Sequence, residues 1–158
     1  MKYSRFEELP VWNAAIELGQ RVLALTSNRA CARQPSLRSQ IERAAVSVSN
    51  NIAEGFERGT TQELLTFLYI ARGSAGEVRS MLCLFERLPA LRELKSEISN
   101  LKPAAEVISR QLRGWADSLQ NSPIKGQRYL TEKTRRLARS ARERDEFLQE
   151  LRCAQGRS

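Results

Sequence analysis

Residues 40–58 read QIERAAVSVSNNIAEGFER, and this stretch decides the fold. Its apolar residues recur every three or four positions, which is the period of one helix face. They are Ile41, Ala44, Ala45, Val48 and Ile52. Small residues occupy Ala44, Ala45, Ser47, Ser49 and Ala53. Such residues let a neighbouring backbone come close, so the stretch predicts tight helix–helix packing rather than chemistry.

Helices are also predicted on both sides of this stretch. Residues 10–26 show the same period and open on Pro10, whose missing N–H costs nothing in a first helical turn. We expect a loop over residues 27–35, with Ser36 capping the helix that continues to about Arg58.

Two more helices are predicted downstream. Thr60 and Glu63 have the spacing of a capping box, which starts a helix that ends near Arg87. From Leu94 to Leu119 the apolar residues follow a seven-residue repeat, which favours the near-parallel packing of a bundle. Pro103 either kinks this last helix or marks its true start.

These patterns predict an all-α chain of 158 residues in two parts. Residues 1–121 form an up-down antiparallel four-helix bundle. Residues 122–158 form a basic C-terminal extension that is helical or partly disordered.

Composition argues against most catalytic chemistry. The chain contains no histidine, the commonest general base and metal ligand near neutral pH. Its three cysteines lack both disulfide pairing and metal-ligand spacing. No apolar run approaches the length of a membrane span, and no signal peptide is evident. We therefore expect a non-enzymatic cytoplasmic protein with no cofactor, no bound metal and no membrane contact.

Positive charge points to anionic partners. The net charge is +8, and residues 122–158 hold 10 Lys and Arg against 5 Asp and Glu. Arginine outnumbers lysine, and its planar fork suits bidentate contact with phosphate. The candidate nucleic-acid-binding residues are Arg38, Arg43, Arg58, Arg72 and Arg79 in the bundle and Lys133, Arg135, Arg136, Arg139 and Arg142 in the extension. The alternative is a set of solvated faces whose arginines make weak ion pairs with nearby acids.

Five residues are assigned structural or interface roles: Asn51, Glu54, Gly55, Gly73 and Gly76. A buried or interfacial Glu54 needs a partner, for example Arg72. Gly55, with Gly59, is attributed to helix termination. Gly73 and Gly76 lie in mid-helix, where glycine is unfavourable. They serve either close contact with the helix of residues 40–58 or contact with a neighbouring subunit.

Three motifs resemble a bacterial four-helix bundle family that includes proteins encoded in intervening sequences of 23S ribosomal RNA genes. They are FEELPVWNAAIEL (6–18), QIERAAVSVSNNIAEGFERGT (40–60) and FLYIARGSAGEV (67–78). The resemblance covers about residues 5–120. The chain departs from the family pattern at Glu42-Arg43, usually an arginine pair, and at Ser49, often a proline.

This resemblance implies a bundle that assembles into a ring, commonly a homopentamer. The related accessory variability proteins of diversity-generating retroelements are similar bundles that bind nucleic acid and a reverse transcriptase. Two hypotheses follow. One is a homo-oligomer that binds structured RNA or other nucleic acid through arginine–phosphate attraction. The other is a scaffold that holds a partner protein, such as a reverse transcriptase or a ribosome-associated protein.

Overall fold

The computed structural model describes residues 3–121, 140 and 144. Contacts divide the chain into two units, Met1–Gly126 and Gln127–Ser158, and every element named below belongs to the first. In chain order these elements are η1 (Phe6–Glu8), α1 (Pro10–Thr26), α2 (Arg29–Ala32), α3 (Pro35–Glu57), α4 (Thr61–Phe85), η2 (Pro89–Leu94) and α5 (Lys95–Gln120).

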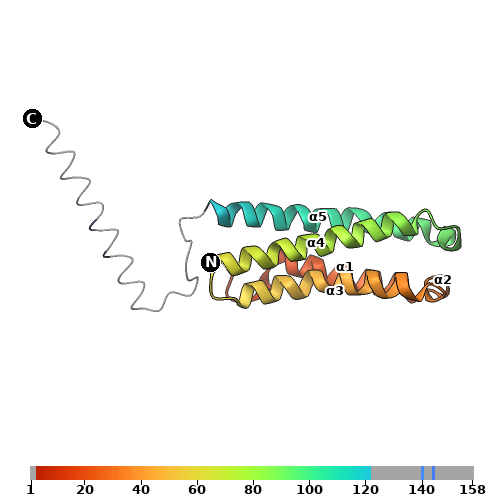
Figure 1. Ribbon diagram of the computed structural model, residues 1–158, viewed down its shortest axis with the longest axis horizontal. Coiled ribbons are helices and arrows are strands. Elements are labelled where there is room, and N and C mark those ends of the chain that lie inside the picture. Colours follow the sequence, from red (N-terminus) through yellow and green to blue (C-terminus); the bar gives the residue numbers. More distant parts are fainter. Residues whose placement is uncertain (1–2, 122–139, 141–143, 145–158) are drawn as a thin grey trace, which may run out of the picture. The chain divides into compact units, whose positions relative to one another are not determined.

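Four long helices, α1, α3, α4 and α5, lie side by side (Figure 1). Each contacts the next along the chain, and α1 contacts α5, which closes the bundle. The short elements α2 and η2 lie together at one end, and the turn between α3 and α4 lies at the other (Figure 1). The predicted all-α, antiparallel four-helix bundle is confirmed. The predicted extension falls outside the described residues, apart from residues 140 and 144.

The core is built from the helix faces that the periodicity predicts. Ile41, Ala45, Val48 and Ile52 of α3 have no exposed surface, and Ala44 is 4% exposed. Burying one large aliphatic side chain contributes about 1.5–3 kcal/mol. Apolar stripes of α1, α4 and α5 complete the same core, so one continuous apolar cluster holds the four helices together.

The connection between α1 and α3 differs from the predicted loop. It contains α2, whose first turn is capped by Asn28, because the side chain of Asn28 accepts a hydrogen bond from the Ala30 N–H at 2.9 Å. Ser36 is not a cap. The helix begins one residue earlier, at Pro35, because proline is already set for the first helical position.

The predicted start of α4 is confirmed. Thr60 precedes the helix and accepts a hydrogen bond from the Glu63 N–H at 3.2 Å, and its hydroxyl donates to Glu63 Oε2 at 2.7 Å. Pro103 lies inside α5, so the alternative in which it marks the start of the helix is wrong. The turn η2 precedes α5 instead.

Glu42, one of the departures from the family pattern, joins α1 to α3. The fully buried Thr26 hydroxyl donates to Glu42 Oε1 at 2.6 Å, and Arg38 Nε donates to the same oxygen at 2.8 Å. The hydrogen bond from Thr26, followed by that from Arg38, holds the pKa of Glu42 below its ordinary value of 4.5. The folded state therefore favours the ionised carboxylate.

This linkage predicts how stability depends on pH. Since folding lowers the pKa of Glu42, its stabilisation is present above pH 4.5 and is lost as pH falls through the folded-state pKa. We expect Glu42→Gln to lower the free energy of unfolding by about 1–2 kcal/mol at neutral pH, with a difference from wild type that shrinks in acid. Urea denaturation across pH measures this difference. Glu106→Gln, at an exposed position on α5, is the control and should show neither effect. A constant difference for Glu42→Gln would contradict the assignment.

Candidate functional site

The predicted bundle arginines do not form one patch. Arg38 and Arg43 lie on α3 and Arg58 directly follows its last residue, whereas Arg72 and Arg79 lie on α4. At about 1.5 Å of rise per residue, Arg38 and Arg58 are roughly 30 Å apart along the helix. They therefore stand near opposite ends of α3.

Arg72 and Arg79 lie on a different side of the bundle from the α3 arginines. Ser74 marks the side of α4 that faces α3, since its hydroxyl is 2.9 Å from that of Ser47. Arg72 is about 200° around the helix from Ser74, and Arg79 continues the stripe of Arg72. A single phosphate chain therefore meets these two groups of arginines on separate surfaces.

Glu54 is paired, but not with Arg72. Its carboxylate accepts a hydrogen bond at 2.5 Å from Arg58, the C-cap residue of α3, four positions further along the chain. The side chains of Glu54 and Arg58 are 50% and 44% exposed, so the pair is a surface ion pair and not a buried one. The Arg58 guanidinium also lies 5.0 Å from the centre of the Phe67 ring. The predicted Glu54–Arg72 pair is therefore wrong.

Asn51 joins a small polar network between α3 and α4. Its Nδ2 donates to the Ser47 carbonyl oxygen at 2.7 Å and to the Ser47 hydroxyl at 2.9 Å. Ser47 in turn contacts Ser74 across the helix pair. These contacts are consistent with the structural role predicted for Asn51, because its amide is used within the bundle.

Gly55 does not terminate a helix. It lies buried within α3, which continues to Glu57. A Cβ atom at Gly55 would lie 2.6 Å from Phe67 Cβ and 3.2 Å from Leu64 Cδ1. The absence of a side chain at Gly55 is therefore what allows α3 and α4 to approach this closely.

Gly73 and Gly76 differ from Gly55. Both are exposed on α4, and a Cβ atom at either would meet nothing within 4 Å. The predicted close contact with the helix of residues 40–58 is therefore wrong. The alternative, contact with a neighbouring subunit, stays a prediction, and Ile70, 46% exposed, lies one turn from Gly73.

A shallow apolar hollow lies between α1 and α3. Leu23 and Val46 are 46% and 42% exposed and line a volume of about 520 Å³. Arg43 and Asn50 stand at its border. This surface offers apolar contact to another protein chain.

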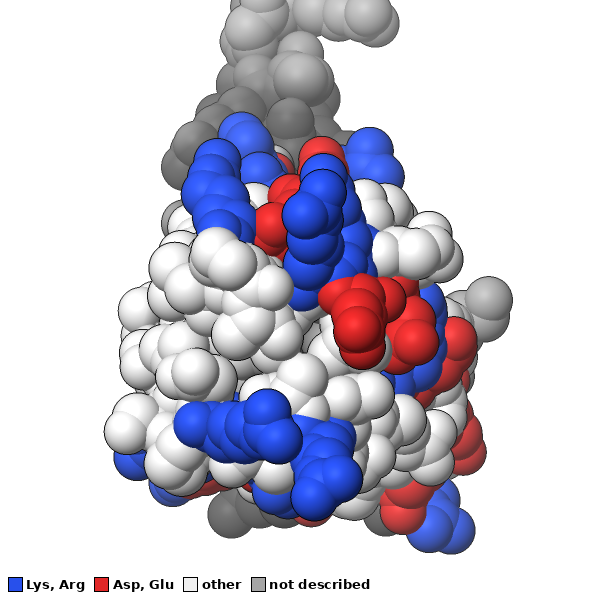
Figure 2. Space-filling model, turned by 90° about the vertical axis from the view of Figure 1, so that its right-hand side faces the viewer, with Lys and Arg blue, Asp and Glu red and all other residues white. Residues whose placement is uncertain are grey.

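Arginines that the sequence did not single out gather at the end of the bundle formed by α2 and η2. Arg29, Arg33 and Arg92 line a hollow of about 460 Å³, with Glu93 as its only carboxylate. Figure 2 looks onto this end and shows Lys and Arg side chains spread over it, with Asp and Glu side chains between them. No spacing rule could have found this group, because α2 and η2 are far apart in the sequence.

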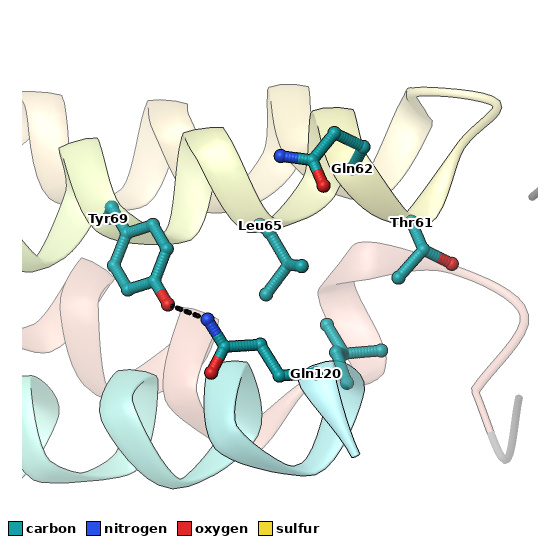
Figure 3. A pocket seen from close by; sticks show the side chains of 6 residues that line it. Thr61, Gln62, Leu65, Tyr69 and Gln120 are labelled. Carbon is teal, nitrogen blue, oxygen red and sulfur yellow. Dashed lines mark hydrogen bonds between the residues drawn. The ribbon is translucent and has the colours of Figure 1, made fainter. Parts of the chain in front are cut away.

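A further hollow of about 260 Å³ lies where α4 begins and α5 ends (Figure 3). Thr61, Leu65 and Tyr69 line it from α4, and Gln120 closes it by donating a hydrogen bond to the Tyr69 hydroxyl at 2.5 Å. Its polar groups are the hydroxyls of Thr61 and Tyr69 and the amides of Gln62 and Gln120.

Other predicted features lie partly or wholly outside the described chain. Lys133, Arg135, Arg136, Arg139 and Arg142 are all outside the described residues. Within the part of the chain that the structure describes, no three Cys, Asp or Glu side chains are placed to hold a metal ion. None of the described helices has the length and apolarity needed to cross a membrane.

Comparison with known proteins agrees with the resemblance seen in the motifs. Residues 7–114 match the family described as 23S rRNA-intervening sequence protein. No curated protein matches the sequence.

Substitutions at two glycines test the close approach of α3 and α4. We expect Gly55→Ala to lower the free energy of unfolding by about 1–3 kcal/mol, because its methyl group would overlap Phe67. Gly73→Ala is the matched control on an open helix face. It should raise the free energy of unfolding by roughly 0.5–1 kcal/mol. Denaturant unfolding of both variants measures the contrast. Equal effects would contradict the packing role of Gly55.

Proposed function

The chain belongs to the 23S rRNA-intervening sequence protein family, and from this premise we propose that it is a non-enzymatic, self-associating bundle that binds nucleic acid. Structured RNA is the ligand proposed first. Arginine–phosphate attraction provides the affinity, and several copies in one ring, most simply a pentamer, raise it through avidity.

The observation that carries this proposal is the surplus of arginine without an acidic partner. Within residues 3–121, the arginines that make ion pairs are Arg5, Arg21, Arg38, Arg58 and Arg113. Most of the remaining arginines, including Arg43, Arg72 and Arg79, have no carboxylate within ion-pair distance in that part of the chain. Unpaired guanidinium groups attract phosphate without first giving up a protein partner. The extension adds further positive charge by sequence alone.

A second candidate function is a scaffold for a partner protein. The exposed Leu23 and Val46 favour it, because apolar side chains on a shared surface support protein contact more than phosphate contact. The two functions are compatible if nucleic acid and protein use different surfaces.

A salt titration tests the first proposal. We expect the full chain to bind an RNA hairpin with an affinity that falls steeply as salt rises, because each neutralised phosphate releases counterions. A chain truncated after Asn121 should show a smaller slope if Lys133, Arg135 and the neighbouring arginines contact phosphate. Fluorescence anisotropy measures both slopes. Absence of binding at low salt would overturn the nucleic-acid proposal and favour the scaffold.

Gly76 provides a test of self-association. Because its surroundings are open within the bundle, Gly76→Leu should leave the helical content unchanged. If α4 contacts a neighbouring subunit there, the same change should reduce the oligomer to smaller species in sedimentation velocity. Gly114→Leu, at an exposed and equally open glycine of α5, is the matched control. Unchanged assembly in Gly76→Leu would exclude this face as the subunit contact.

A further inference from the structure

Two short elements hold three arginines around one hollow at the α2–η2 end of the bundle. Cys31 of α2 and Leu91 of η2 are each 1% exposed, and Leu94 is 5% exposed. These buried side chains anchor both elements to the core. The exposed Arg29, Arg33 and Arg92 are therefore carried on fixed backbone at the rim of the hollow, although their side chains reach into solvent.

The charges at this hollow are not balanced within the bundle. Arg29 and Arg33 are four residues apart, so they share one side of the α2 turn, where like charges repel. Glu93 is the only acid that lines the hollow, and no carboxylate of residues 3–121 lies within ion-pair distance of these three arginines. An anion placed there would relieve the repulsion.

Helix dipoles do not supply the positive potential at this end. Two of the long helices, α3 and α5, begin here, and two, α1 and α4, end here. Their partial charges are opposite in sign and largely cancel. The arginine side chains therefore decide the sign of the field at the hollow.

We propose that Arg29, Arg33 and Arg92 form a binding site for the phosphodiester backbone of nucleic acid. The site deepens the proposed function, on which it rests, by placing the phosphate contacts at this end of the bundle. Arginine suits this ligand because its fork can make two hydrogen bonds to one phosphate. Arg29 and Arg33, from α2 and its C-cap, and Arg92, from η2, all line the hollow, so a phosphate chain bound there can meet both segments. Small side chains, Ala30, Pro89 and Ala90, line the remainder and leave room for the chain.

The test compares two triple variants of the full chain that lose the same charge. The first is Arg29→Gln/Arg33→Gln/Arg92→Gln. The second, Arg21→Gln/Arg58→Gln/Arg113→Gln, removes arginines that already have carboxylate partners. The probe is an RNA hairpin, and the measured quantity is the slope of log affinity against log salt concentration. We expect this slope to be less steep by about 2 in the first variant than in the wild type. The slope of the control should change by less than half as much.

The outcomes separate this site from the proposed function. If wild type binds RNA and both variants weaken equally, net charge alone matters and the site is overturned. If neither variant weakens, the site is also overturned while RNA binding stands. If wild type binds no RNA, both proposals fail, and binding to vesicles of phosphatidylserine would then identify a membrane ligand instead.

A chemical readout tests the site with the wild-type sequence. Hydroxyphenylglyoxal modifies exposed arginines, and mass spectrometry locates the adducts. We expect the RNA hairpin to protect Arg29, Arg33 and Arg92 more than Arg110, an exposed arginine on α5. Equal protection at all four positions would overturn the proposal. Circular dichroism of both triple variants checks that their helical content matches that of the wild type, including the control, which loses the hydrogen bond from Arg21 to the Asn100 carbonyl.

Discussion

At Gly55, α3 passes α4 so closely that a single added carbon would lie 2.6 Å from Phe67 Cβ. The rest of the bundle depends on this approach. Small core residues such as Ala45 and Ala75 are fully buried, and their small volume is compatible with close helix packing. Hydrogen bonds between Ser47 and Ser74 and between Gln40 and Glu77 then fix how α4 is placed along α3. Close packing and polar contacts therefore set the same register.

On its other side, α3 is joined to α1 through the carboxylate of Glu42. Glu42 accepts hydrogen bonds from the buried Thr26 of α1 and from Arg38 of α3, so its carboxylate joins the two helices. The pairing of Arg38 with Glu42 limits its availability to phosphate. An arginine bound to a carboxylate with lowered pKa is already neutralised locally, and a phosphate must compete with that carboxylate for it. Arg58 also has a carboxylate partner, Glu54, with which a phosphate must compete.

The sequence predicted the fold well because periodicity and capping are local properties. Each confirmed feature depends on residues within a few turns of one another. These features are the apolar face from Ile41 to Ile52, the capping box of Thr60 and Glu63, and the helix start at Pro10. Predictions that needed distances between helices did less well. The sequence suggests Arg72 on α4 as the partner of Glu54, although Arg58 is four residues away, and it attributes Gly55 to helix termination, although Gly55 packs inside α3. It predicts a loop where α2 lies, because four residues are too few to show a period.

The number of basic residues along the sequence and their placement in the structure favour different phosphate-binding surfaces. A count of basic residues points to α3, α4 and the extension, where arginines are frequent along the chain. Long helices, however, also bring acids within one turn of arginines, and the resulting ion pairs remove part of that charge. Short elements such as α2 and η2 have fewer neighbours at that spacing. Their arginines stay unpaired within residues 3–121 and are held by buried Cys31 and Leu91. Within residues 3–121, long helices also carry unpaired arginines such as Arg43, Arg72 and Arg79, but Arg29, Arg33 and Arg92 differ in lining one hollow together.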